Sequence, residues 1–209
     1  MKIEIKNVEK QFKKVKVLEN INLKMSDGHI YGLKGRNGSG KTVFLKILCR
    51  IYRPSSGCVL FDNKEYQSIK EYVPNTRALI EKPCFFPNLT GLENLKLLAQ
   101  IQNKISDQEI LDSLEIVNLI NEKDKKFSQY SLGMKQKLGI AQVFMENPHV
   151  LILDEPFNGI EKESVEKIKQ YLLKEKKKGK IIIISSNVDK DLDDFADVIF
   201  KFDGGKIES

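Results

Sequence analysis

Residues 30–42 read IYGLKGRNGSGKT, a short apolar run that leads directly into a glycine-rich loop. The run 30–33 has the length of a buried strand, and residues 41–50 are predicted to form a helix. The loop satisfies the pattern G-x-x-x-x-G-K-[ST], which cradles nucleotide phosphates when it lies between a strand and a helix. Its members are Gly35, Arg36, Asn37, Gly38, Ser39, Gly40, Lys41 and Thr42. The sequence therefore predicts a binding site for ATP or GTP.

Each residue type in this loop has a physical task. Glycines let backbone N–H groups approach phosphate oxygens without side-chain clashes. The N-terminus of the following helix directs its dipole at the same anion. Lys41 is expected to reach the β- and γ-phosphates, and the Thr42 hydroxyl is expected to bind Mg²⁺.

A second feature is the run 150–155, which reads VLILDE. A continuous apolar run that ends in two carboxylates is typical of a buried strand that reaches the surface at its carboxyl end. Beside a phosphate loop, Asp154 would hold Mg²⁺ through a water, and Glu155 would polarise the water that attacks the γ-phosphate. We therefore predict a hydrolytic site and not a binding site alone.

The order of the remaining elements predicts the fold class. Expected strands are 2–5, 15–18, 21–25, 30–33, 150–153, 181–185 and 198–202. Expected helices are 41–50, one apolar stripe over 92–99, another over 110–117, then 131–145 and 161–176. The second stripe begins with a capping box, in which Ser106 precedes Glu109 by three residues. This order predicts an α/β fold with a parallel sheet and a helical insertion between about residues 83 and 147.

Composition limits the classes of partner. The net charge is +6, but the excess is carried by lysine, whereas arginine is the residue that forks onto phosphates and base edges. The basic stretch 174–180 is interpreted as the solvated end of a helix, and no nucleic-acid partner is expected. No apolar run approaches the roughly 20 residues of a membrane span, and the N-terminus does not have the pattern of a signal peptide.

The cysteines are Cys49, Cys58 and Cys84, and they lack the spacing of a zinc site. Their odd number also argues against a disulfide framework. The pattern fits a reducing compartment, so we expect a cytoplasmic protein.

Residues 131–136, SLGMKQ, precede the acid pair by about twenty residues. With the phosphate loop and the acid pair, they make the chain resemble the ABC ATPase family. The resemblance implies that Ser131 and backbone N–H groups bind the γ-phosphate of ATP held by an opposite subunit, a helix N-terminus again meeting an anion. Gly133 would permit the close approach. A complete site would then need two chains, head to tail.

The resemblance covers nearly the whole chain. It implies a P-loop NTPase core with a mainly parallel central sheet, an N-terminal antiparallel β-subdomain and an inserted α-helical subdomain at about 83–147. Residues 1–209 would form a single ABC-type ATP-binding domain. Phe12 matches the aromatic residue that stacks on adenine, and Glu161 stands in the D-loop where an Asp is usual.

Two positions depart from the family pattern. Glu81 stands where a Gln usually leads into the helical insertion, and the segment 79–95 is similar to subunits of bacitracin- and lantibiotic-type exporters. Glu81 is a candidate ligand of Mg²⁺ or its water. Asn187 stands where a His usually contacts the γ-phosphate, and an amide carries no charge and shuttles no proton. We therefore expect hydrolysis to be slower than in a relative with the His.

These features predict an ATP-hydrolysing subunit of an ABC transporter. It would be an exporter of antimicrobial peptides or drug-like molecules. The cofactors would be ATP and Mg²⁺, and the partners a second ATP-binding subunit, as a homodimer, and a separate transmembrane permease. The chain would lie at the inner face of the cell membrane through that permease. Two alternatives stay open: a regulatory ATP-binding module with little hydrolysis, and a soluble ABC ATPase that acts on nucleic acid or the ribosome.

Overall fold

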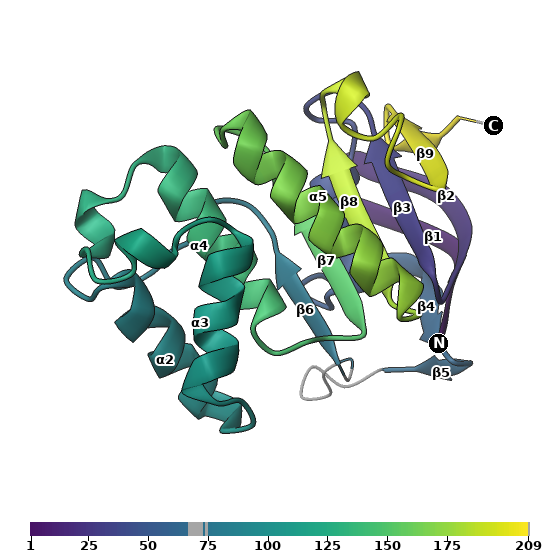
Figure 1. Ribbon diagram of the computed structural model, residues 1–209. Helices are drawn as coiled ribbons and strands as arrows, with labels where there is room; N and C mark the ends of the chain where they lie inside the picture. Colours follow the sequence, from purple (N-terminus) through teal and green to yellow (C-terminus); the bar gives the residue numbers. More distant parts are fainter. Residues whose placement is uncertain (67–72, 74, 209) are drawn as a thin grey trace.

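The computed structural model describes residues 1–66, 73 and 75–208. In Figure 1, α2, α3 and α4 lie to the left of the two sheets, and α5 crosses in front of the central sheet. The strands are β1 Lys2–Phe12, β2 Val15–Ser26, β3 His29–Lys34, β4 Ser56–Phe61, β5 Lys64–Glu65, β6 Thr76–Leu79, β7 Val150–Asp154, β8 Ile181–Ser186, β9 Val198–Asp203 and β10 Lys206–Ile207. The helices are α1 Lys41–Leu48, α2 Gly91–Gln102, α3 Asp107–Ile116, α4 Leu132–Phe144 and α5 Lys162–Lys177. Short 3-10 turns span Ile120–Glu122, Phe127–Gln129 and Asp189–Asp191.

The central sheet has the strand order β10-β9-β3-β8-β7-β6. Strands β9, β3, β8, β7 and β6 run parallel, and only β10 pairs antiparallel, with β9. The carboxyl ends of β3 and β7 therefore meet at one edge of the sheet, where the phosphate loop and the acid pair follow them. The predicted parallel α/β sheet is confirmed.

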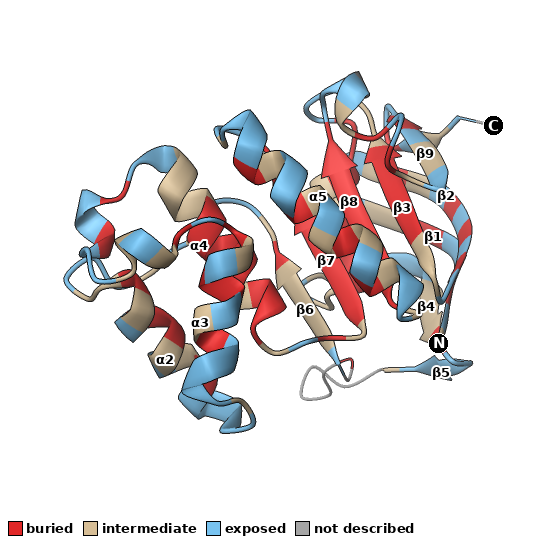
Figure 2. Cartoon of the chain, viewed as in Figure 1, coloured by how far each residue is buried: buried red, intermediate tan, exposed pale blue. Residues whose placement is uncertain are grey.

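Helices cover both faces of this sheet, so β7 and β8 are buried along their whole length (Figure 2). Alternate side chains of a strand point to opposite faces. In β8, Ile182 and Ile184 join the core that contains α4 and α5, whereas Ile181 and Ile183 join the core that contains α1. Two separate apolar cores, one on each face of the sheet, thus hold β7 and β8 between the helices.

The second sheet is antiparallel, in the order β2-β1-β4-β5. The prediction of separate strands at 15–18 and 21–25 is wrong, because β2 is continuous through Asn20. Asn20 has φ 51°, a left-handed conformation that Asn tolerates, and the pairs Leu18–Lys10 and Ile21–Val8 lie on either side of it. Strand β4 was not among the expected strands, and its second residue, Gly57, has φ 75°.

The helices between β6 and β7 begin with local signals that the sequence contains. The capping box at Ser106 and Glu109 is confirmed, and a second one joins Thr90 to Glu93 at the start of α2. Ser131 is the N-cap of α4, and its hydroxyl accepts a hydrogen bond from the N–H of Met134 at 3.2 Å. Each cap satisfies backbone N–H groups that have no partner within the helix.

The interpretation of 174–180 as a solvated helix end is wrong for Glu175 and Lys180, which are buried. Lys180 is 6% exposed and forms an ion pair with Glu175, which is 1% exposed. Lys178 also bonds Glu175, at 2.6 Å. A buried carboxylate between two ammonium groups explains why the pKa of Glu175 is lowered although burial acts to raise it.

Cys49, Cys58 and Cys84 are free thiols. Within the part of the chain that the structure describes, no helix has both the length and the apolar character to cross a membrane.

Candidate active site

The phosphate loop connects β3 to α1 and has a backbone that only glycine accommodates at several points. Gly38 has φ 81° and Gly40 has φ 106°. A Cβ on Gly35 would lie 2.3 Å from the carbonyl oxygen of Phe202. Ser39 Oγ is buried and lacks a hydrogen-bond partner among the described residues. The loop is thus a tight cradle that leaves one polar group for a ligand to satisfy.

Lys41, the first residue of α1, is 4% exposed and folds back over this cradle. Its Nζ donates to the carbonyl oxygens of Gly35 at 2.6 Å and Arg36 at 3.1 Å. Burial lowers the pKa of Lys41, and the carboxylates of Glu155 and Asp154 act in the opposite direction. A buried cation held only by carbonyl oxygens is well suited to turn towards a phosphate.

Asp154 ends β7 and is tied to two neighbouring elements. The Thr42 hydroxyl donates to Asp154 Oδ2 at 2.8 Å, and the Ser185 hydroxyl of β8 donates to Asp154 Oδ1. The structure therefore brings together the hydroxyl and the carboxylate that the sequence predicted as magnesium ligands. Both are hard oxygen donors, the type that Mg²⁺ prefers.

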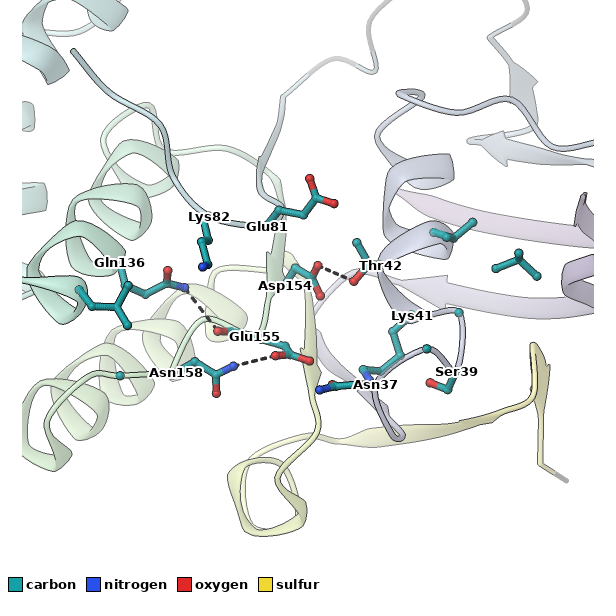
Figure 3. Close-up of a pocket in the computed structure, with 16 residues that line it drawn as sticks. Asn37, Ser39, Lys41, Thr42, Glu81, Lys82, Gln136, Asp154, Glu155 and Asn158 are labelled. Atoms are coloured by element: carbon teal, nitrogen blue, oxygen red, sulfur yellow. Dashed lines mark hydrogen bonds between the residues drawn. The ribbon is translucent and has the colours of Figure 1, made fainter. Parts of the chain in front are cut away.

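Glu155 follows at once, with φ 46°, a left-handed conformation uncommon for a non-glycine residue. Its N–H donates to Ser185 Oγ at 2.9 Å, and its Oε2 accepts a bond from Asn158 Nδ2 at 2.7 Å (Figure 3). Gln136 Nε2 donates to the Glu155 carbonyl oxygen at 3.4 Å. Ser185 thus holds both members of the acid pair, and Asn158 aims the second one.

Residues 37–43 and the acid pair line one cavity of about 580 Å³. In Figure 3 the acid pair lies between the loop on one side and Gln136 on the other. The described lining is Val17, Asn37, Gly38, Ser39, Gly40, Lys41, Thr42, Val43, Glu81, Lys82, Leu132, Gln136, Asp154, Glu155, Asn158 and Gly159.

Glu81 and Lys82 lie at the lip of the cavity and direct their side chains oppositely. In Figure 3 the Glu81 carboxylate points away from Glu155, while Lys82 points towards it. Glu81 forms an ion pair with Lys46 Nζ at 2.6 Å, and this bond raises the pKa of Lys46. The predicted metal ligand thus lines the cavity without turning its carboxylate inward.

The remaining predicted site residues lie outside the described lining. Ser131 and Gly133 stand at the exposed N-terminus of α4, where a Cβ on Gly133 would lie 2.4 Å from the carbonyl oxygen of Gly159. Asn187 is exposed and donates from Nδ2 to Asn37 Oδ1 at 3.2 Å. Phe12, 39% exposed, packs edge-on against Tyr52 with ring centroids 5.3 Å apart.

Glu161, the residue in the D-loop position, is the N-cap of α5. Its Oε1 accepts bonds from Lys137 Nζ of α4 and from Ser164 Oγ, both at 2.6 Å. These hydrogen bonds lower the pKa of Glu161 to about 2. The ion pair ties α4 to the segment that follows the acid pair.

Sequence reasoning missed Ser185, Asn158, Gln136 and Lys46. A polar residue directly after the apolar run 181–184 was the available signal for Ser185, since parallel strands end at the same edge of a sheet. Gln136 ends the quoted segment 131–136 and Asn158 begins the D-loop segment 158–161, so both had a local signal. Lys46 is placed by a contact with a distant segment, and we find no local signal for it.

Comparison with known proteins decides the family. Residues 18–158 match the ABC transporter family. The chain belongs to the ABC transporter family. It is 43% identical over 199 residues to the bacitracin transport ATP-binding protein BcrA of Enterococcus faecalis, and the alignment covers 94% of this chain and 65% of that protein. It is 33% identical over 205 residues to the lantibiotic transport ATP-binding protein SrtF of Streptococcus pyogenes, and the alignment covers 98% of this chain and 88% of that protein.

A solved structure supports the same conclusion. A dimeric ATP-binding cassette bound to ADP and Pi superposes with a TM-score of 0.89 at 25% identity, covering 99% of this chain and 97% of that chain. The predicted fold is confirmed, with its mainly parallel central sheet, N-terminal antiparallel sheet and inserted helices. The predicted likeness to bacitracin- and lantibiotic-type subunits is confirmed as well. This chain is an ATP-binding ABC ATPase.

Proposed function

We propose that this chain hydrolyses MgATP to drive a separate membrane permease that exports antimicrobial peptides or drug-like molecules. The observation that carries the hydrolytic part is the cavity in which the phosphate cradle faces the acid pair, where Ser185 bonds the Asp154 carboxylate and the backbone N–H of Glu155. The export part rests on the relatives, whose names describe bacitracin and lantibiotic transport. Because the chain spans 65% of the Enterococcus faecalis protein, that protein's activity and partners are proposals for this chain.

The cradle fits the phosphates of ATP. The N–H groups of the loop and the unpartnered Ser39 hydroxyl would bind phosphate oxygens. Lys41 would exchange the carbonyl oxygens of Gly35 and Arg36 for the β- and γ-phosphates. Phe12 would stack on adenine, next to Val17 at the edge of the cavity.

Thr42 and Asp154 fit Mg²⁺, which neutralises charge on the β- and γ-phosphates when bound. Thr42 would bind it directly and Asp154 through a water, and Glu81 would join once it leaves Lys46. Glu155 would accept the proton of the attacking water on Oε1, since Asn158 already occupies Oε2.

A complete site would need a second chain. Ser131 and Gly133 lie outside the lining of their own chain's cavity, at the exposed end of α4. A helix N-terminus in that position suits the γ-phosphate of ATP bound to another copy. The related cassette bound to ADP and Pi is dimeric, which supports a homodimer here.

A permease would dock beside the helical region, at the cytoplasmic face of the membrane. Phe86 is 60% exposed, and on α2 Leu97 is 41% and Ile101 77% exposed. Several large exposed apolar side chains in one region of the surface suit the binding of a protein partner. Phe86 follows Glu81 by five residues, so movement at the cavity lip would reach it.

The test is steady-state phosphate release from MgATP by the purified chain. We expect turnover that is lost in Lys41→Ala and in Glu155→Gln and kept in Lys104→Ala and Glu115→Gln, which change exposed residues of the same types. Equal turnover in all five proteins would overturn the site assignment.

Partners are tested in the same assay. Stimulation by a detergent-solubilised permease would support the transport function, whereas stimulation by RNA or DNA would favour the nucleic-acid alternative. ATP binding with no turnover, alone or with the permease, would favour a regulatory module, for which Asn187 is the motivating residue.

A further inference from the structure

Lys46 is a residue of α1 that the proposed chemistry leaves without a role. It lies four residues after Thr42, so both side chains emerge from the same face of the helix, one turn apart. Its Nζ reaches across to segment 80–82 and bonds Glu81 Oε1 at 2.6 Å. The carboxylate that would serve the metal site is therefore held one helical turn from the Thr42 hydroxyl.

The two partners differ in their freedom to move. The Lys46 side chain is 15% exposed, whereas the Glu81 side chain is 64% exposed. Lys46 Nζ also lies 5.3 Å from the centre of the Tyr52 ring, a cation–π contact, and Tyr52 in turn packs against Phe12. Lys46 is thus fixed on its own element, and Glu81 is the partner that can swing.

Glu81 combines an uncommon backbone conformation with an outward side chain. Glu81 has φ 62°, a left-handed conformation, and its carboxylate points away from the acid pair (Figure 3). Because the carboxylate points away from the acid pair and is bonded to Lys46, contact with a metal between Thr42 and Asp154 would require it to turn and release Lys46.

We infer that Lys46 is a positioning residue that competes with Mg²⁺ for the Glu81 carboxylate and holds this segment outward until MgATP binds. The inference rests on the proposed function, in which Glu81 serves the metal. The exchange of Lys46 for the metal would couple nucleotide binding to movement of segment 80–82. The contact of Tyr52 with Phe12 would link the same lysine to the predicted adenine position.

The experiment measures how much Mg²⁺ strengthens nucleotide binding. The affinity for a fluorescent imido analogue of ATP is determined with and without Mg²⁺ for the wild type, Lys46→Met, Glu81→Gln and the double variant. Methionine keeps an unbranched stem against Tyr52 and removes the charge. Lys104→Met is the matched control at an exposed lysine.

We expect Lys46→Met to raise the Mg²⁺-dependent gain in affinity roughly twofold to fivefold, the range of an exposed ion pair. In the Glu81→Gln background the same change should have no effect, because the competition is gone. A gain that is equal in both backgrounds would overturn the inference, since Lys46 would then act on the metal by charge alone. No gain in either background would overturn it too.

Failure of the proposed function would look different. In that case the wild type would bind no MgATP analogue, or Glu81→Gln would leave the Mg²⁺-dependent gain at the wild-type value. A second readout is the rate of phosphate release. The Mg²⁺ concentration that gives the half-maximal rate should change in Lys46→Met and should equal the wild-type value in Lys104→Met.

Discussion

Replacing Ser185 with alanine should separate the folding and catalytic tasks of the acid pair. Ser185 is fully buried, and its hydroxyl donates to Asp154 and accepts from the N–H of Glu155. A hydrogen bond to a charged group contributes about 1.5–3 kcal/mol. In the variant the Glu155 N–H can still donate to the Ser185 carbonyl oxygen, which lies 3.2 Å away. Losing the bond from Glu155 should therefore cost less than losing the bond to Asp154.

We expect Ser185→Ala to lower the free energy of unfolding by about 2–3 kcal/mol. For a chain of this size, 1 kcal/mol shifts the melting temperature by roughly 2–4 °C, so the shift should be roughly 4–12 °C. The Asp154 carboxylate and the backbone of Glu155 also lose the hydroxyl that holds both. A loss of about 1.4 kcal/mol in transition-state stabilisation would lower kcat about tenfold.

The adjacent serine provides a matched control. Ser186 is 2% exposed, and its hydroxyl donates to Asp191 Oδ2 at 2.9 Å and accepts from the Val188 N–H at 3.0 Å. Ser186→Ala therefore removes a similar pair of bonds from the same strand without touching the acid pair. It should lose similar stability and keep its kcat.

The assay combines urea unfolding, followed by circular dichroism, with phosphate release at saturating MgATP per folded molecule. If Ser185→Ala kept wild-type turnover while losing the same stability as Ser186→Ala, then Ser185 would be structural only, and our account of the acid pair would be wrong.

Three further outcomes follow from single changes. Asn187→His should raise the rate of phosphate release, because imidazole can carry charge and shuttle a proton; an unchanged rate would contradict our reading of Asn187. Gly133→Ala should abolish ATP-dependent dimerisation, because its Cβ would lie 2.4 Å from the Gly159 carbonyl oxygen and would force the N-terminus of α4 to shift. Size-exclusion chromatography of a hydrolysis-deficient protein measures this, and normal dimers would show that the close approach at Gly133 is dispensable. The lowered pKa of Glu161, about 2 against an ordinary 4.5, means that its bond with Lys137 stabilises the fold above pH 4.5 and that this contribution is lost as the pH falls towards 2. The difference in unfolding free energy between wild type and Glu161→Gln should therefore be constant above pH 4.5 and shrink below it, and a gap that stays constant in urea titrations down to about pH 3 would refute the assignment.

The parallel sheet could be predicted because its strands carry their own signal. The apolar runs 150–153 and 181–184 are too continuous for a half-exposed strand, and the strands that contain them are buried as expected. The cap at Ser106 could be predicted for a similar reason, since a capping box depends on residues three apart in the chain.

Short or irregular strands were not predictable in this way. Strand β6 has four residues, Thr76–Leu79, and only its pairing with β7 makes it a strand. The continuity of β2 through Asn20 likewise depends on β1, which pairs with both halves. Local propensity is weaker than such pairing, so the partner strand decides the outcome.

By itself the sequence determined the phosphate loop, the acid pair and the helix start at Ser131, because each is a local pattern whose chemistry depends on neighbours in the chain. Only the tertiary structure decided which groups hold these residues. Ser185 meets Asp154 because β7 and β8 pair in register, and Lys46 meets Glu81 because α1 packs beside the end of β6. Such contacts join segments 31 and 35 residues apart, and pairing between distant segments leaves no pattern at either position that sequence periodicity could reveal.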